Sequence, residues 1–158
     1  MAEFKIDLTD NTGDIINAIE ELTQAALEAV GQTAERHAKE GAPVGTTLST
    51  NIKDYHGGAL RKSLTHKVVG DDVFIGTNIR SSNNAPYAVY VEMGTGIYAT
   101  EGNGRQSPWV WRDKNGKFHS TRGMKPTHFL KKAISSPEHI NEYKAVIKAV
   151  FEGKNNEK

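Results

Sequence analysis

The sequence predicts an α+β fold in which a long N-terminal helix and shorter helices pack on a small, mainly antiparallel β-sheet. Three observations indicate this class: apolar residues recur every three or four positions near the N-terminus, two hairpin patterns follow, and helical periodicity returns at the C-terminus. The chain has 158 residues, which is room for one ordinary domain. We therefore expect a single domain over residues 1–152 and a disordered tail at 153–158.

The first predicted element is a helix from residue 14 to about residue 40. Thr12 or Asp14 can cap its start, and Gly41 followed by Pro43 is a stop signal. Because its apolar stripe narrows from Ile and Leu to Ala, we expect another segment to approach the C-terminal half closely. The stripe consists of Ile15, Ile19, Leu22, Ala26, Val30, Ala34 and Ala38.

A polar loop and a first hairpin come next. Residues 45–57 are rich in Thr, Ser, Asn and Gly, which predicts an exposed and mobile loop. Strand patterns at Leu64–Val69 and Val73–Thr77 flank Gly70-Asp71-Asp72, and that turn sequence is typical of a hairpin.

A short helix and a second loop occupy the middle of the chain. Pro86 suits the first turn of a helix over Tyr87–Met93, and Gly94-Thr95-Gly96 ends it. Residues 97–108 contain two glycines and a proline and predict another mobile loop.

A second hairpin and two further helices complete the fold. Trp109-Val110-Trp111 and Lys117-Phe118-His119 flank an Asn-Gly pair, the strongest short hairpin signal. Helical patterns follow over Thr127–Ile134 and Pro137–Phe151.

The charge of the chain is nearly balanced overall but is unevenly distributed. Its formal net charge is +1, which excludes a globally basic nucleic-acid-binding surface. Residues 1–42 carry nine acidic and three basic side chains, whereas residues 103–132 carry eight basic side chains and one acidic one. Two such regions can attract each other between copies of the chain, or they can simply pair within one fold.

The sequence shows no catalytic constellation. The absence of cysteine excludes disulfides, thiolate catalysis and cysteine-based metal centres. Glu92 lies in an apolar segment, where it is either a buried acid or a carboxylate that ends a helix and binds backbone or a basic neighbour. We expect no enzymatic activity, no metal and no cofactor. None of the histidines falls at metal-binding spacing: His37, His56, His66, His119, His128 and His139.

Nothing in the sequence predicts contact with a membrane. The N-terminus lacks the basic and apolar regions of a signal peptide, and no apolar run approaches the roughly 18 residues of a membrane span.

The remaining candidate for a functional surface is the basic and aromatic segment 103–132. Aromatic rings among cations can stack on bases while the cations meet phosphates, which would make a small nucleic-acid-binding module. Alternatively, tryptophans at alternate strand positions form one face of a core or a protein interface. The candidate contact residues are Arg105, Trp109, Trp111, Arg112, Lys114, Lys117, Arg122 and Lys125.

Three segments together resemble a known family. Ala42-Pro43-Val44 with Gly58-Ala59-Leu60-Arg61-Lys62-Ser63-Leu64 resembles the element A-P-V … T-G-x-L-R-x-S-I. Residues Ala85–Gly96 resemble Y-A-x-Y-V-E-x-G-T, and Met124–Ile134 resemble P-x-x-F-L-x-x-A. This order, after a long helix, is similar to that of the small tail-completion, or head–tail joining, proteins of long-tailed bacteriophages and prophages.

The resemblance implies a structural role in the virion, at the head–tail interface, after assembly in the bacterial host cytoplasm. It implies a ring of copies around the DNA channel, with other connector and tail proteins as partners. It implies no reaction and no cofactor. We expect the basic segment to meet either the acidic helix of a neighbouring copy or the DNA in the channel.

Overall fold

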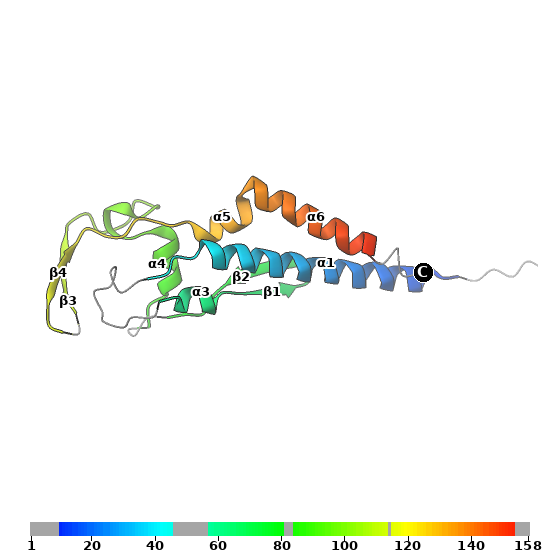
Figure 1. Cartoon of the computed structure of the whole chain (residues 1–158), viewed down its shortest axis with the longest axis horizontal. Coiled ribbons are helices and arrows are strands. Elements are labelled where there is room, and N and C mark those ends of the chain that lie inside the picture. The colour runs from blue at the N-terminus through cyan, green and yellow to red at the C-terminus, as the bar shows by residue number, and fades with distance from the viewer. Residues whose placement is uncertain (1–9, 46–56, 81–83, 114, 154–158) are drawn as a thin grey trace, which may run out of the picture.

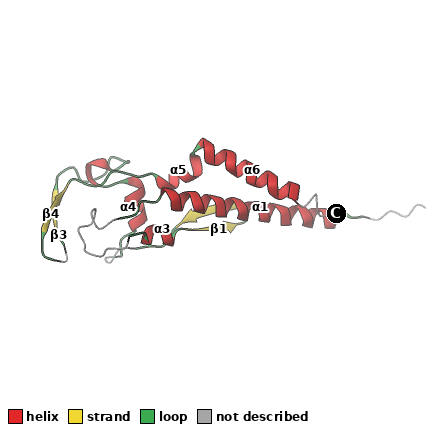
Figure 2. Cartoon of the chain, in the orientation of Figure 1, coloured by secondary structure: helices red, strands yellow, loops and turns green. Residues whose placement is uncertain are grey.

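The computed structural model describes residues 10–45, 57–80, 84–113 and 115–153. The predicted loop at 45–57 and tail at 153–158 lie almost wholly outside these ranges, as does Lys114. The fold is α+β, as predicted, and it is elongated along its longest helix (Figure 1). Helices make up most of the described residues, with two small hairpins beside them (Figure 2).

The long helix α1 (Thr12–Gly41) forms the spine of the molecule. Its start is capped differently from the prediction, because neither Thr12 nor Asp14 caps it. Instead, the Asp10 carboxylate accepts a hydrogen bond of 2.9 Å from the backbone N–H of Thr12. The helix ends at Gly41, as the following Pro43 predicts.

The first hairpin packs along α1. It consists of β1 (Thr65–Val69) and β2 (Asp72–Gly76), which pair antiparallel around the predicted turn. His66 makes the close approach to α1 that we predicted, because its ring lies over Gly31. A Cβ atom added to Gly31 would be only 2.4 Å from Cδ2 of the His66 ring. Gly31 therefore makes room for β1.

The second hairpin consists of β3 (Trp109–Arg112) and β4 (Phe118–Thr121) and forms a separate sheet. The single small sheet that we expected is thus two sheets of two strands each. Figure 1 shows the reason, because β3 and β4 stand at the end of the molecule beyond α4 (Tyr87–Met93), far from β1 and β2.

Two helices close the chain on the side of α1. Helix α5 (Phe129–Ser135) crosses near the end of α1, and α6 (Pro137–Gly153) runs back along it. His37 of α1 stacks on the ring of His139 and forms a 2.8 Å hydrogen bond with Glu142. The two helices are therefore joined by polar as well as apolar contacts.

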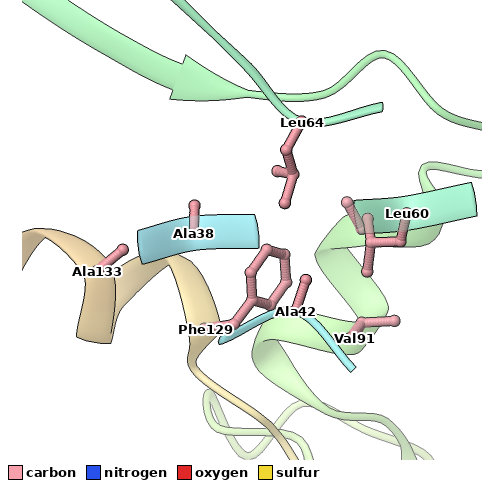
Figure 3. Close-up of a cluster of buried hydrophobic side chains, with 8 residues drawn as sticks. Ala38, Ala42, Leu60, Leu64, Val91, Phe129 and Ala133 are labelled. Atoms are coloured by element: carbon pink, nitrogen blue, oxygen red, sulfur yellow. The ribbon is translucent and has the colours of Figure 1, made fainter. Parts of the chain in front are cut away.

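The hydrophobic core is small and lies where α1, α4, α5 and the short helix α3 (Ala59–Ser63) meet (Figure 3). Phe129, Leu64 and Val91 are its largest fully buried side chains. Alanines at the end of α1 let the other helices approach closely. The buried cluster consists of Ala38, Ala42, Leu60, Leu64, Ala88, Val91, Phe129 and Ala133.

No helix in the described ranges combines the length and the apolar character that crossing a bilayer requires.

Candidate functional site

The candidate site is a projecting hairpin, which we call the basic arm (residues 105–125). It contains all eight predicted contact residues, although Lys114 lies outside the described ranges. The two strands of the arm pack on each other rather than on a helix, and they form one end of the elongated molecule (Figure 1). The arm takes no part in the core, so the interpretation of the tryptophans as one face of the core is wrong.

The strand register divides the arm into two faces. Trp109 pairs with Thr121 and Trp111 with His119, so these side chains share one face, on which the rings of Trp111 and His119 stack with centroids 4.6 Å apart. The Arg105 guanidinium lies 5.7 Å from the centre of the Trp109 ring, close enough for a cation–π contact. The two tryptophans thus share one aromatic face, with the His119 ring and the Arg105 guanidinium beside them.

The opposite face carries different chemistry. Val110, Arg112 and Phe118 share it, and Val110 and Phe118 are 63% and 69% exposed. The Arg112 guanidinium lies 5.6 Å from the Phe118 ring and donates a hydrogen bond of 3.0 Å to the backbone carbonyl of Gly116. An apolar pair therefore stands in solvent with one positioned cation beside it.

The turn of the arm uses its only acidic side chain structurally. One carboxylate oxygen of Asp113 accepts hydrogen bonds of 2.9 Å from the backbone N–H groups of Asn115 and Lys117. Its other oxygen accepts one of 2.9 Å from the His119 ring, and this bond is the main reason that the pKa of Asp113 is lowered. Among the described residues, Asp113 forms its ion pair with His119 and none with Arg112 or Lys117.

The base of the arm is pinned to the segment that follows α4. Thr95 donates its backbone N–H to the carbonyl of Met124 at 2.8 Å and accepts a 2.9 Å bond from the Met124 N–H. Gly96 has φ of +62°, and a Cβ there would lie 2.0 Å from the carbonyl oxygen of Arg122. Only glycine lets the two backbones approach so closely, so the segment after α4 holds the base of the arm in place. Lys125 lies over the ring of Tyr98 at this base.

Two of the segments that resemble the phage family, residues 85–96 and 124–134, are hydrogen-bonded to each other next to the base of the arm. The Glu92 carboxylate accepts hydrogen bonds of 2.9 and 3.0 Å from the backbone N–H groups of Leu130 and Lys131, at the start of α5. Thr127 donates to the carbonyl of Val91 through both its N–H and its hydroxyl. Of the two interpretations of Glu92, the one in which it binds backbone is confirmed, although the helix that it caps is α5 and not its own.

The acidic helix does not neutralise the arm within one chain. Among the described residues, the ion pairs that leave α1 run to His66 of β1 and Glu142 of α6, and none reaches the arm. Figure 1 shows why, because the N-terminal half of α1 and the arm lie at opposite ends of the long axis.

The largest pKa shift belongs to Glu35 of α1, which faces His66 of β1. The Lys39 ammonium and then the His66 ring hold the pKa of Glu35 down, to about 2. Glu35 in turn raises the pKa of His66, which also bonds Glu28 at 2.9 Å. No group of three or more potential metal ligands occurs among the residues that the structure describes. We interpret the ion pairs of His66 with Glu28 and Glu35 as interactions that hold the first hairpin on α1.

Sequence reasoning missed one surface. Ile15, Ile16 and Ile19 of α1 are all at least half exposed, although Ile15 and Ile19 belong to the same stripe as the buried Ala26, Ala34 and Ala38. The periodicity of α1 places these residues on one side of the helix, but nothing in the described structure covers the N-terminal part of that side.

The fold and the site together define an elongated α+β domain with a projecting basic arm. In comparisons with known proteins, no family model, no curated protein and no solved structure matches the chain.

Proposed function

We propose that the protein is a structural virion protein of a tailed bacteriophage or prophage, which completes the tail and joins it to the head connector as part of a ring. The observation that carries the proposal is that the three resembling segments form one unit in space. Nearly every member of the buried cluster comes from them: Ala42, Leu60, Leu64, Ala88, Val91, Phe129 and Ala133.

The shape and the surface of the molecule support the proposal. A joining protein works through contacts with several neighbours, and this chain carries large exposed apolar side chains at both of its ends, among them Ile15, Ile19, Val110 and Phe118. Exposed apolar side chains that gather together mark protein interfaces. The base of the arm is also bound to Thr95 and Gly96, which anchors it to the rest of the molecule.

The proposal is tested in particles. Deletion of the gene from its phage or prophage should leave filled heads and separate tails, or tails with an unfinished upper end, in electron micrographs. Complementation by Arg112→Glu/Lys117→Glu should fail, whereas Lys144→Glu/Lys148→Glu, an equal change of charge on exposed α6 positions, should restore joining. Normal infectious particles from the deletion would refute the role.

A second function, a small nucleic-acid-binding module, is favoured by one observation. Arg105 and Trp109 place a cation against an aromatic ring, an arrangement that can stack on a base. Binding through phosphate contacts must weaken steeply as salt rises, because each neutralised phosphate releases counterions. A titration of labelled single- and double-stranded DNA at several salt concentrations tests this, and salt-independent or absent binding would exclude it.

A further inference from the structure

The N-terminal half of α1 presents an unpartnered apolar patch. Ile15, Ile16 and Ile19 are 58%, 50% and 53% exposed. They lie on one side of the helix, since positions three and four apart are neighbours there. Three half-exposed isoleucines on one helical face are more than the scattered single residues that any protein surface carries.

The surroundings of the patch are acidic. Between residues 10 and 21 the chain has four acidic side chains and no Lys or Arg. A shallow groove beside Ile19 is lined by Glu20, Thr23 and Gln24 of α1 and by Asp71 of the first hairpin turn. Two such patches would therefore repel each other, so α1 is unsuited to pairing with the same region of a second copy.

The face of the basic arm that carries Val110, Arg112 and Phe118 is complementary to this patch. Val110 and Phe118 supply exposed apolar surface, and Arg112 stands beside them as a positioned cation. Nucleic acid would use the Phe118 ring and the Arg112 cation of this face but not Val110, because an aliphatic side chain offers no stacking surface. An apolar partner with acidic neighbours uses all three side chains.

We propose that the basic arm of one copy docks, through Val110, Arg112 and Phe118, on the apolar and acidic patch around Ile19 and Glu20 of a second copy. The partner is therefore another molecule of this same chain. Because the arm and the patch lie at opposite ends of the molecule, the contact is head-to-tail and can be repeated from copy to copy (Figure 1). A head-to-tail contact produces a ring when the rotation closes and an open filament when it does not.

This contact rests on the proposed function in one respect, since it would supply the contact between subunits of the ring. The complementarity of the arm and the patch itself is a property of this chain alone. Its test therefore uses the purified full-length protein and no phage component.

The first experiment is site-specific cross-linking, for which the absence of native cysteine is an advantage. Ser120→Cys lies on the same face as Val110, and Thr23→Cys lies in the acidic groove, so both leave the apolar anchors in place. A mixture of the two variants, treated with a short bismaleimide, should form heterodimers more than about tenfold faster than a mixture of Ser120→Cys with Ser135→Cys, because docking raises the effective thiol concentration. Ser135 is an exposed control position on α5.

Charge exchange then identifies the contact. Arg112→Glu in the Ser120→Cys chain, or Glu20→Arg in the Thr23→Cys chain, should each slow the cross-linking severalfold, because like charges then face each other. The two changes combined, one in each partner, should restore the rate towards that of the parent pair. A misfolded arm could lower the rate, but it could not be rescued by a change in the other molecule.

Each outcome decides the proposal. Equal rates for the groove and control positions, or failure of the charge exchange to restore the rate, would overturn it. So would a preference of Thr23→Cys for itself, which would indicate pairing of α1 with α1. Cross-linking that fails while the gene deletion still leaves heads and tails unjoined would remove this contact and keep the proposed function. Cross-linking that succeeds while the deletion gives normal particles would do the reverse.

Discussion

Substitution of Gly31 by alanine should destabilise the protein, although alanine is the better helix former. The substitution adds a Cβ that would lie 2.4 Å from Cδ2 of the His66 ring and 3.1 and 3.2 Å from two further ring atoms. The ring cannot swing aside freely, because its nitrogens form hydrogen bonds of 2.5 and 2.9 Å with Glu35 and Glu28. Either the ring leaves these partners or β1 moves away from α1.

The size of the effect follows from two opposing contributions. Replacing glycine by alanine inside a helix stabilises it by about 1 kcal/mol. Forcing an extra methyl group into a packed contact costs about 1–3 kcal/mol. We therefore expect the free energy of unfolding to fall by about 1 kcal/mol, as measured by urea denaturation followed by far-UV circular dichroism.

Two further variants separate the contact from helix propensity. Gly13→Ala lies in the same helix with nothing within 4 Å of the added Cβ, so it should stabilise the protein or leave it unchanged. In a His66→Ala background the clash is gone, and Gly31→Ala should then be stabilising. A stabilising Gly31→Ala in the otherwise unchanged chain would show that His66 does not lie over α1 as described.

Four further substitutions test other contacts by the same denaturation assay. Glu92→Gln should cost about 1 kcal/mol, because the charged acceptor for the first N–H groups of α5 is lost. Phe129→Ala should cost about 3–5 kcal/mol in the core, whereas Phe118→Ala on the exposed arm should stay within about 0.5 kcal/mol. His66→Gln should show a pH window. Because the pKa of His66 is raised above 6.5 in the folded protein, its contribution to stability is complete below pH 6.5 and is lost as the pH rises through the raised pKa. Because the pKa of Glu35 is lowered from 4.5 to about 2, its contribution is complete above pH 4.5 and is lost as the pH falls towards 2. The difference from the unmodified chain should therefore be widest between pH 4.5 and 6.5, and a difference that does not vary with pH would contradict the assignment.

Most secondary structure could be predicted from local signals. The end of α1 at Gly41, the turn at Gly70 and the Asn115-Gly116 hairpin all depend on backbone preferences of a few adjacent residues. The cap of α1 was predicted wrongly: the N-cap position is Asn11, whose side chain forms no capping hydrogen bond, and the Thr12 N–H is bound by Asp10, which lies one residue before Asn11. The separation of the two hairpins was also missed, since strand patterns do not state which strands are neighbours.

The candidate site was predictable in composition but not in arrangement. Alternating charges and aromatic residues identified the arm, yet its two faces emerge only from the register that sets Trp111 opposite His119 and Arg112 opposite Phe118. Likewise, periodicity placed Ile15 and Ile19 in one stripe with the alanines of α1. Periodicity could not indicate that the stripe extends beyond the segments that cover it, because that depends on the length of α1 relative to the elements packed on it.

The distribution of apolar side chains connects the stability of this fold with its proposed assembly. Phe129, Leu64 and Val91 are the largest fully buried side chains among the described residues, and most other members of the buried core are alanines. Apolar side chains of similar size, among them Ile15, Ile19, Val110 and Phe118, stand exposed at the two ends of the molecule. The basic arm at one end is a two-stranded hairpin, and such a hairpin is only marginally stable by itself. Docking of the arm on α1 of a second copy would bury both surfaces at once. Because a partner that binds the folded state adds to its stability by mass action, the apparent stability should then rise with protein concentration. The same property suits a joining protein, since a contact that forms only where copies are concentrated restricts assembly to the growing particle.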